Sequence, residues 1–259
     1  MTTYSTLLAQ MTGGGGRRAL EVPADWLQGR TVFGGLQVAV AVQAMRDLVP
    51  DAPLRSVQAT FIAPATGDLT ASATVLRTCK SVTHVQAQLG AGEVQTIVVG
   101  VFGVGRSSRV QVTPRQVPVT PGEPRPMVYV PGLVPAFTQH FAVQWLEGSP
   151  PFTGDTSTRH VIEVSLRDEG PATEAHVFAF ADFIPPMGLS HLKAPAPGSS
   201  VTWMLDFIAG DVSTLGLERW RVDADLMFAR DGYTSQSLVL WGPNGEPVAL
   251  GRQAMTVFD

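Results

Sequence analysis

The residue type best suited to chemistry is an aspartate inside an apolar segment. Asp182 follows the apolar residues 177–181, precedes Phe183 and Ile184, and Pro185-Pro186 closes the segment. Taking a carboxylate out of water penalises its charged form and raises its pKa, so an acid in such a place is usually paired or used. We therefore predict a catalytic role for Asp182. The alternative is a helix whose acid points to solvent or caps a neighbouring loop.

A pair of glycines marks a second candidate position. Gly34 and Gly35 precede an apolar stretch that runs to Leu48 and is followed by Pro50, which predicts a buried helix. Glycine permits close backbone approach, and the N–H groups at a helix start can receive a carbonyl oxygen or a phosphate. We predict substrate binding by both glycines; alternatively, they only turn the chain into the helix. This helix has no acid before Arg46, so we expect one chemical centre per chain.

Strand-like runs follow both candidate positions in the same order. Asp182 falls in a predicted helix from about residue 171 to 184, which strand-like residues 141–146 and 161–167 precede. Four further strands are predicted in each half, over residues 54–63, 69–77, 82–89 and 94–104, and over 201–208, 217–228, 233–241 and 248–257. The repeat predicts an internal duplication of a two-layer α+β unit, a long helix against a curved antiparallel sheet. Two unrelated α+β domains are the alternative.

The duplicated halves set the predicted domain boundaries. Residues 106–134 are rich in proline and have no periodic apolar pattern, which is typical of an extended connection. We predict a first domain over residues 1–110, a linker over 111–134 and a second domain over 135–259. The run Gly13 to Gly16 is interpreted as a mobile loop. The two halves are expected to pair edge to edge or helix to helix.

Composition excludes several classes of function. A net charge of -4 with 15% charged residues offers no basic field for nucleic acid. Cys79 is the single cysteine, so no intrachain disulfide can form, and no Cys/His cluster suggests a zinc site. The start of the chain does not resemble a secretory signal, and no apolar stretch approaches the ~20 residues that span a bilayer. We expect a soluble, cytoplasmic protein that does not bind membranes.

Several short motifs occur together in the two halves. The first half has Val-Phe-Gly-Gly-Leu-Gln-Val-Ala at residues 32–39 and Thr-Phe-Ile-Ala-Pro at residues 60–64. The second half has Phe-Ala-Asp-Phe-Ile-Pro-Pro at residues 180–186, Val-Thr-Trp at 201–203 and the segment 244–253. In these motifs the chain resembles the bacterial type II acyl-CoA thioesterases, which are double-hotdog proteins. The resemblance implies two tandem hotdog domains. Thr78-Cys79-Lys80-Ser81 departs from the basic-Gly-Ser turn that is common in the family.

What the resemblance implies is hydrolysis of acyl-CoA thioesters, in fatty acid metabolism, by a water that an Asp, a Thr and a Gln activate. These residues match Asp182, Thr202 and Gln253. Aligning Asp206 with the acid that the family carries two residues after the Thr would instead put Met204 at the Thr position. The expected ligand is acyl-CoA, no metal or redox cofactor is expected, and a homo-oligomer is possible because hotdog sheets tend to join.

Those residue types suit the reaction. A hydrolase must hold a water against the carbonyl carbon, accept its proton and stabilise the oxyanion. Burial would raise the pKa of Asp182, and hydrogen bonds from Thr202 and Gln253 would keep it partly ionised. Two other functions stay open: a double hotdog that binds acyl-CoA or another apolar ligand without turnover, and a hotdog hydratase or dehydratase. The active site of a hotdog hydratase or dehydratase pairs an acid with a histidine, and none of the five histidines falls naturally near Asp182.

Overall fold

The computed structural model describes residues 1–90, 92–119 and 122–258. Residue 91 of the predicted first domain, residues 120 and 121 of the predicted linker and residue 259 of the predicted second domain lie outside the described residues. The domain boundaries therefore stay a prediction.

Within the described residues, one 13-stranded sheet forms the framework of the molecule, and β3 (Leu27–Gln28) pairs separately with β4 (Thr31–Val32). The first half contributes β1 (Thr12–Gly14), β2 (Arg17–Leu20), β5 (Leu54–Phe61), β6 (Leu69–Thr78), β7 (Val82–Leu89) and β8 (Thr96–Gly103). The remaining strands are β9 (Arg125–Pro126), β10 (Phe141–Glu147), β11 (Arg159–Leu166), β12 (Gly198–Phe207), β13 (Trp220–Arg230), β14 (Tyr233–Trp241) and β15 (Pro247–Val257).

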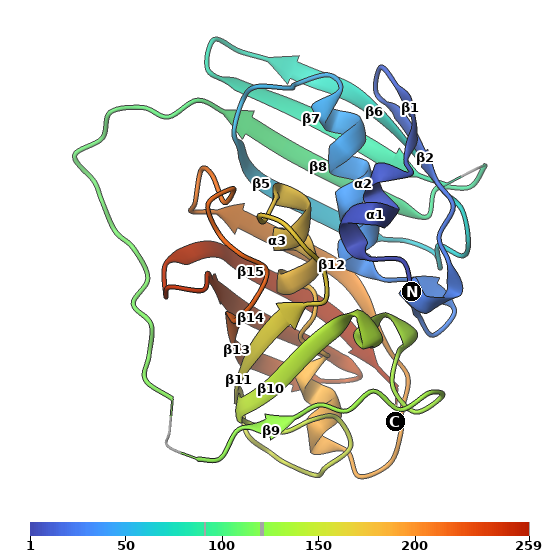
Figure 1. The fold of residues 1–259 in the computed structure, drawn as a ribbon, viewed down its shortest axis with the longest axis vertical. Coiled ribbons are helices and arrows are strands. Elements are labelled where there is room, and N and C mark those ends of the chain that lie inside the picture. Colours follow the sequence, from blue (N-terminus) through green and yellow to red (C-terminus); the bar gives the residue numbers. More distant parts are fainter. Residues whose placement is uncertain (91, 120–121, 259) are drawn as a thin grey trace.

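The two halves join at the central strands β5 and β12. These strands are antiparallel, and Gln58 faces Met204 in the middle of their pairing. Outward from this seam the order is β5-β8-β7-β6-β2-β1 on one side and β12-β15-β14-β13-β11-β10-β9 on the other. Apart from β9, equivalent strands hold equivalent places, as Figure 1 shows. The predicted α+β architecture is confirmed, and the duplicated units pair edge to edge.

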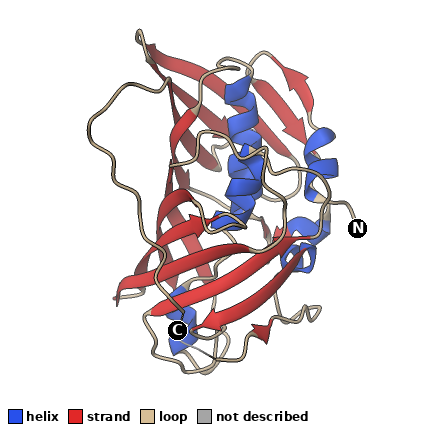
Figure 2. Ribbon diagram, turned by 60° about the vertical axis from the view of Figure 1, so that its left-hand side comes forward, coloured by secondary structure: helices blue, strands red, loops and turns tan. Residues whose placement is uncertain are grey.

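Two helices cover the concave side of the sheet and lie against each other. These are α2 (Gly34–Arg46) and α3 (Glu174–Ala181), and Figure 2 shows the strands curving around them. Ten of the thirteen residues of α2 are buried, because the helix packs on the sheet, on α3 and on the N-terminal segment. A helix enclosed in this way can be apolar on every face, which is why its valines do not disfavour it.

The helix that carries the candidate acid is shorter than predicted. It spans Glu174–Ala181 rather than residues 171–184, and Asp182 is its C-cap, with φ -92° and ψ -1°. Thr173 begins the helix, because its side chain and that of His176 form a capping box. The prolines at 185 and 186 disfavour helical conformation just before them. Asp182 therefore lies at the end of an apolar helix, not within it.

The N-terminal segment is more ordered than the sequence indicates. Gly13 to Gly16, predicted as a mobile loop, belong to the β1–β2 hairpin. Gly13 and Gly14 end β1, and Gly15 and Gly16 form the turn, with φ of 62° and 90°. The hairpin follows α1 (Tyr4–Ala9) and pairs with β6. In the second half, the short helix η2 (Ala136–His140) precedes β10 and β11 in the same manner. The repeated unit therefore starts before each long helix.

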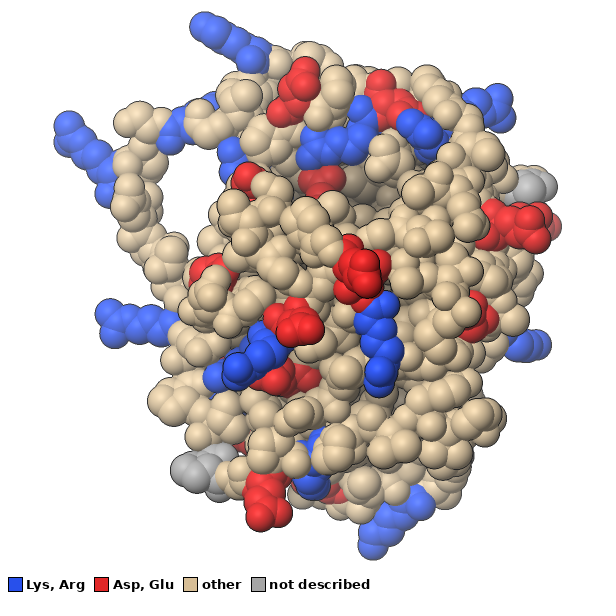
Figure 3. Space-filling view, in the orientation of Figure 1, with Lys and Arg blue, Asp and Glu red and all other residues tan. Residues whose placement is uncertain are grey.

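The surface carries charges of both signs. On the face in Figure 3, basic and acidic side chains are interspersed rather than gathered by sign. Across the described residues, the helices are too short or too polar to cross a membrane.

Candidate active site

Asp182 accepts hydrogen bonds from both halves of the chain. Its Oδ2 lies 2.7 Å from the backbone nitrogen of Gly35, the second residue of α2. Its Oδ1 lies 3.0 Å from Nε2 of Gln253, on the last strand of the sheet. The side chain is buried, with 9% of the residue exposed. The structure thus brings together the predicted acid, the predicted glutamine and one predicted glycine.

Gln253 makes two hydrogen bonds through its amide nitrogen and none through its amide oxygen among the described residues. It lies on β15 opposite Trp203 of β12, and 1% of it is exposed. Its Nε2 also donates to Oγ of Ser200 at 2.9 Å. Its Oε1 is buried and has no hydrogen-bond partner among the described residues. A buried amide oxygen in this state is an acceptor available to a small polar ligand such as water.

Thr202 is the predicted site residue that the structure does not bring to Asp182. It lies on β12, pairs with Thr60 across the seam, and is exposed on the outer face of the sheet. The alternative residue, Met204, shares this face and is 36% exposed. A strand presents alternate residues to opposite faces, so the odd-numbered Trp203 faces inward and its two even-numbered neighbours cannot. The expected hydrogen bond from Thr202 to Asp182 is therefore wrong.

Ser200, rather than Thr202, is the β12 residue whose hydroxyl lies in the hydrogen-bonded group, where it contacts Gln253. The pairing of β12 with β15 shifts register between Ser200 and Thr202, so Val201 is an extra residue and Ser200 returns to the inner face. There its Oγ meets Gln253. A bulge of this kind has no clear signature in a single sequence, although Ser200 adjoins the matched segment 201–203. Sequence reasoning missed this residue for that reason.

The two glycines lie directly against the carboxylate. A Cβ at Gly34 would come within 2.7 Å of Oδ2 of Asp182, and one at Gly35 would come within 2.7 Å of the carbonyl oxygen of Phe178. Side chains at either position would therefore overlap their neighbours. The Gly35 N–H donates to Asp182 instead of standing free for a substrate, which differs from the sequence-based expectation. Gly34 lines a cavity beside the acid.

Burial controls the protonation of the acid. Desolvation raises the pKa of Asp182 to about 7, and the hydrogen bonds from the Gly35 N–H and Gln253 act against this rise. Burial of the Tyr4 hydroxyl, together with the nearby charge of Asp182, raises the pKa of Tyr4. Asp182 therefore holds a substantial ionised fraction near neutral pH and can both accept and return a proton.

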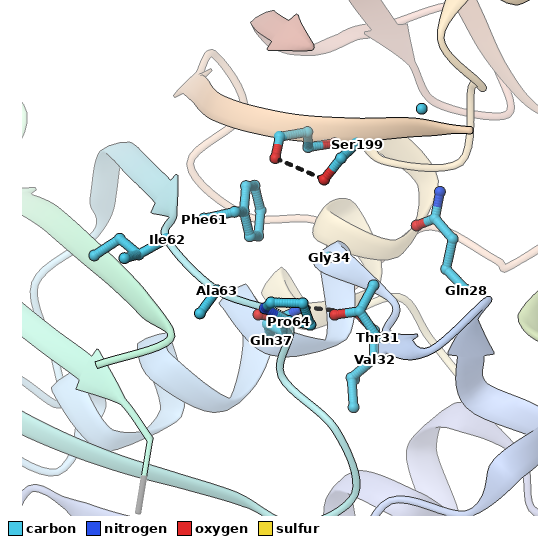
Figure 4. Close-up of a pocket in the computed structure, with 12 residues that line it drawn as sticks. Gln28, Thr31, Val32, Gly34, Gln37, Phe61, Ile62, Ala63, Pro64 and Ser199 are labelled. Carbon is cyan, nitrogen blue, oxygen red and sulfur yellow. Dashed lines mark hydrogen bonds between the residues drawn. The ribbon is translucent and has the colours of Figure 1, made fainter. Parts of the chain in front are cut away.

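The cavity next to Asp182 lies between the two halves. It has a volume of about 150 Å³, and Figure 4 shows the side chains that surround it. Gly34 and Gln37 come from α2, Phe61 from the end of β5, Thr31 from β4 and Ser200 from β12. All twelve lining residues are uncharged. This space can receive an uncharged group beside Gly34.

Other polar groups lie away from this cavity. His176 is at the N-terminal end of α3, where its Nδ1 accepts from the Thr173 N–H at 2.9 Å and its Nε2 is 3.1 Å from Oγ of Ser5. Tyr4, which sequence reasoning also missed, donates its hydroxyl to the carbonyl oxygen of Ala175 at 3.1 Å and so fixes α1 on α3. In the part of the chain that the structure describes, no group of three or more His, Cys, Asp or Glu side chains could hold a metal ion.

Comparison with protein families gives matches over most of the chain. Residues 22–105 match the model of the acyl-CoA thioesterase N-terminal domain, and residues 113–257 match that of the acyl-CoA thioesterase C-terminal domain. No protein of curated function matches the sequence.

Solved structures share the fold over the full length. A protein of unknown function with a hot dog fold from Alicyclobacillus acidocaldarius is 22% identical, with a TM-score of 0.87 over 100% of this chain and 99% of that one. A putative thioesterase II from Thermobifida fusca YX is 20% identical, with a TM-score of 0.79 over 100% and 98%. A putative thioesterase from Novosphingobium aromaticivorans is 20% identical, with a TM-score of 0.75 over 96% and 98%. The predicted hotdog fold is confirmed.

Proposed function

Because the chain belongs to the acyl-CoA thioesterase family, we propose that it hydrolyses acyl-CoA thioesters to the free acid and CoA with a water activated by Asp182. The observation that supports this most is a buried carboxylate that accepts from Gly35 and Gln253 and has a pKa of about 7. Such a group is an effective general base near neutral pH.

In the proposed reaction, the water sits between Asp182 and the free Oε1 of Gln253. Asp182 takes one proton while the water oxygen forms a bond to the thioester carbonyl carbon. The carbon–sulfur bond of the resulting tetrahedral intermediate then breaks, and the proton on Asp182 passes to the departing CoA sulfur. The products are a carboxylic acid and CoA thiol, and the carboxylate of Asp182 is restored.

The remaining residues hold this arrangement. Ser200 accepts from Nε2 of Gln253, which holds the amide nitrogen between Ser200 and Asp182 and leaves the Oε1 for the water. Gly34 lines the cavity at the start of α2, where backbone N–H groups are not used within the helix. We assign the Gly34 N–H to the carbonyl oxygen of the substrate, whose negative charge grows during attack. Thr202 has no role in this proposal.

The test is release of CoA thiol from acyl-CoA esters by the native protein and by Asp182→Asn. We expect the variant to lose about 10²- to 10⁴-fold in kcat, because the amide cannot accept the proton. Glu174→Gln is the matched control, since it makes the same carboxyl-to-amide change at the other end of the α2–α3 pair, and it should retain turnover. Equal rates for native protein and Asp182→Asn would refute the mechanism. Binding of acyl-CoA without thiol release would indicate a non-catalytic binding protein.

A further inference from the structure

Gln236 is a second buried glutamine beside Gln253. The two residues lie directly opposite each other in the pairing of β14 with β15, and each is 1% exposed. Directly opposite residues of an antiparallel pair point to the same face of the sheet. Gln236 therefore shares the inner face on which Gln253 donates to Asp182.

One end of the Gln236 amide is held and the other end is free. Its Oε1 accepts from the N–H of Met187 at 2.9 Å, at the start of the short helix η3 (Met187–His191). A backbone N–H can only donate, so this bond fixes which end of the amide is the oxygen. The Nε2 is buried and has no hydrogen-bond partner among the described residues. A buried donor in this state costs about 1–3 kcal/mol unless a ligand or a water accepts from it.

The free atoms of the two glutamines are complementary. Gln236 offers a donor, and Gln253 offers the unpartnered acceptor Oε1. The Cβ atoms of directly opposite residues lie about 4.5–5.5 Å apart, so one water can contact both side chains. Such a water accepts from Nε2 of Gln236 and donates to Oε1 of Gln253. Its second proton is then available to Asp182, which Gln253 already contacts at 3.0 Å.

The equivalent position in the first half is apolar. By the registers outward from the seam, Gly100 holds the place of Gln253. Val85, which faces Gly100 on β7, holds the place of Gln236 and is fully buried. The fold therefore accepts a valine at this position, and packing on the sheet does not require a glutamine. The polar pair occurs in the half that carries Asp182.

We infer that Gln236 is a further catalytic residue, whose Nε2 donates to the water that Asp182 activates. The inference rests on the proposed hydrolysis. The water directs its two protons to Asp182 and Gln253 and one lone pair to Gln236, so one lone pair is left to form the bond to the thioester carbon. Gln236 thus restricts the direction of attack, and it neither gains nor loses a proton.

The kinetic test measures thiol release by the native protein, Gln236→Met and Val85→Ala, with the best substrate among acetyl-, octanoyl- and palmitoyl-CoA. Methionine nearly preserves the length of the side chain but cannot donate. We expect Gln236→Met to lower kcat by about 10- to 100-fold and to keep KM within about twofold of native, because Gln236 contacts the water and not the ester. Val85→Ala removes buried atoms at the equivalent place and should lower the melting temperature without altering kcat.

The outcomes separate the inference from the proposed function. Native turnover that Gln236→Met retains in full would overturn the inference and leave the proposed function standing. A native protein that releases no thiol from any of the three esters would reject the proposed function, and the inference with it.

Trp203 is the competing donor. It faces Gln253 from β12, and its buried Nε1 also has no partner among the described residues. Its ring packs edge-on against Phe178, one helical turn before Asp182, whereas Gln236 contacts the chain beyond this acid. Trp203→Phe removes the N–H and should keep kcat within about threefold of native. A larger loss in Trp203→Phe than in Gln236→Met would assign the water to Trp203 and overturn the inference.

A crystal structure separates water binding from the anchoring of η3, because Gln236→Met also removes the acceptor of the Met187 N–H. In the native crystal we expect a water within hydrogen-bond distance of Gln236 Nε2, Gln253 Oε1 and the Asp182 carboxylate. In Gln236→Met this water should be missing while Asp182 keeps its position. Displacement of Asp182 in the variant, or no water at this place in the native crystal, would overturn the inference. The native crystal decides the point even if the variant does not fold.

Discussion

The two ends of the α2–α3 pair hold equivalent places in the duplicated fold but opposite chemistry. At one end the carboxylate of Asp182 accepts from a backbone N–H and an amide. At the other end Glu174 accepts from Arg46, with Nε to Oε2 at 3.0 Å and Nη2 to Oε1 at 2.6 Å. A two-point pairing with a guanidinium uses both carboxylate oxygens and holds the side chain in one orientation.

The strands beneath the helices show the same contrast. The Gln58–Met204 pair is the midpoint of the β5–β12 pairing. A two-fold rotation about an axis through this pair superposes the two halves and places Trp203 at the position of Val57. Their partners on the neighbouring strands are Gln253 and Gly100. A Cβ at Gly100 would lie 2.7 Å from Sδ of Met45, so this methionine takes the room that a glutamine would need.

Ser200 has an apolar counterpart as well. It lies just before a register shift in β12, and Leu54 lies just before the corresponding shift in β5. The fold therefore offers two equivalent positions, and only one has the polar side chains that activate water in our proposal. The following predictions test this difference, from the largest expected effect to the smallest.

The largest effect concerns pH and the stability of the native protein. The folded-state pKa of Asp182, about 7, lies above its ordinary value of 3.8, so the neutral acid stabilises the fold. That contribution is complete below about pH 4 and is lost as the pH rises toward 7. The Asn variant cannot ionise, so its free energy of unfolding relative to native should increase from pH 4 to pH 8, by up to about 4 kcal/mol. Urea unfolding at several pH values measures this, and parallel curves would contradict it.

The second effect is steric. Gly34→Ala places a Cβ against Oδ2 of Asp182 and should displace the carboxylate, with a loss of about 100-fold in kcat/KM, because small misplacements at a reacting centre are costly. Gly210→Ala is the control at the opposite end, where a Cβ would meet nothing within 4 Å. Steady-state thiol release measures both. Equal activities of the two variants would show that the carboxylate tolerates the shift.

The third effect separates the residue matched by sequence from the residue that the structure brings to the site. Ser200→Ala removes an acceptor from Gln253 and should lower kcat by about tenfold, whereas Thr202→Ala alters the outer face and should have little effect. Ser200→Thr keeps the hydroxyl and should restore most of the rate. A larger loss of kcat in Thr202→Ala than in Ser200→Ala would favour the residue matched by sequence over the residue that the bulge brings to Gln253.

The smallest effect lies at the ion-paired end. Glu174→Gln should lower the free energy of unfolding by about 1 kcal/mol or less, because the two side chains are 21% and 26% exposed and solvent weakens their attraction. Thermal unfolding measures the change. A larger loss of stability would mean that the ion pair contributes more than its exposure suggests, and a loss of turnover would mean that this end also supports the chemistry.

Most of the framework could be predicted from sequence because its signals are local. Alternating apolar residues and glycine-bearing turns placed β7 and β14 at their observed bounds, 82–89 and 233–241. The strands of the N-terminal hairpin have only three and four residues, too few for a periodic pattern, and their glycines are typical of a loop. The end of α3 was misplaced because apolar residues continue past Asp182.

The site was predicted in part, because some of its contacts depend on features that no local sequence pattern reports. Asp182 stands out as an acid among apolar residues, and Gln253 was found through resemblance rather than pattern. Ser200 depends on a one-residue bulge that reverses which side chains of β12 face inward. The bond between Gly35 and Asp182 joins residues 147 positions apart, which no local pattern can report.

The covalent continuity of β5 and β12 within one polypeptide has a consequence for how such a protein can change over generations. In an assembly of two identical chains, every mutation strikes both symmetry-related positions, and a gain in rigidity at one costs the other its reactivity. Here the seam joins two segments of a single gene product, so each position mutates independently. The end with the Arg46–Glu174 ion pair can therefore become more rigid without any change at the Asp182 end. Because one gene encodes both ends, the difference between them is inherited together.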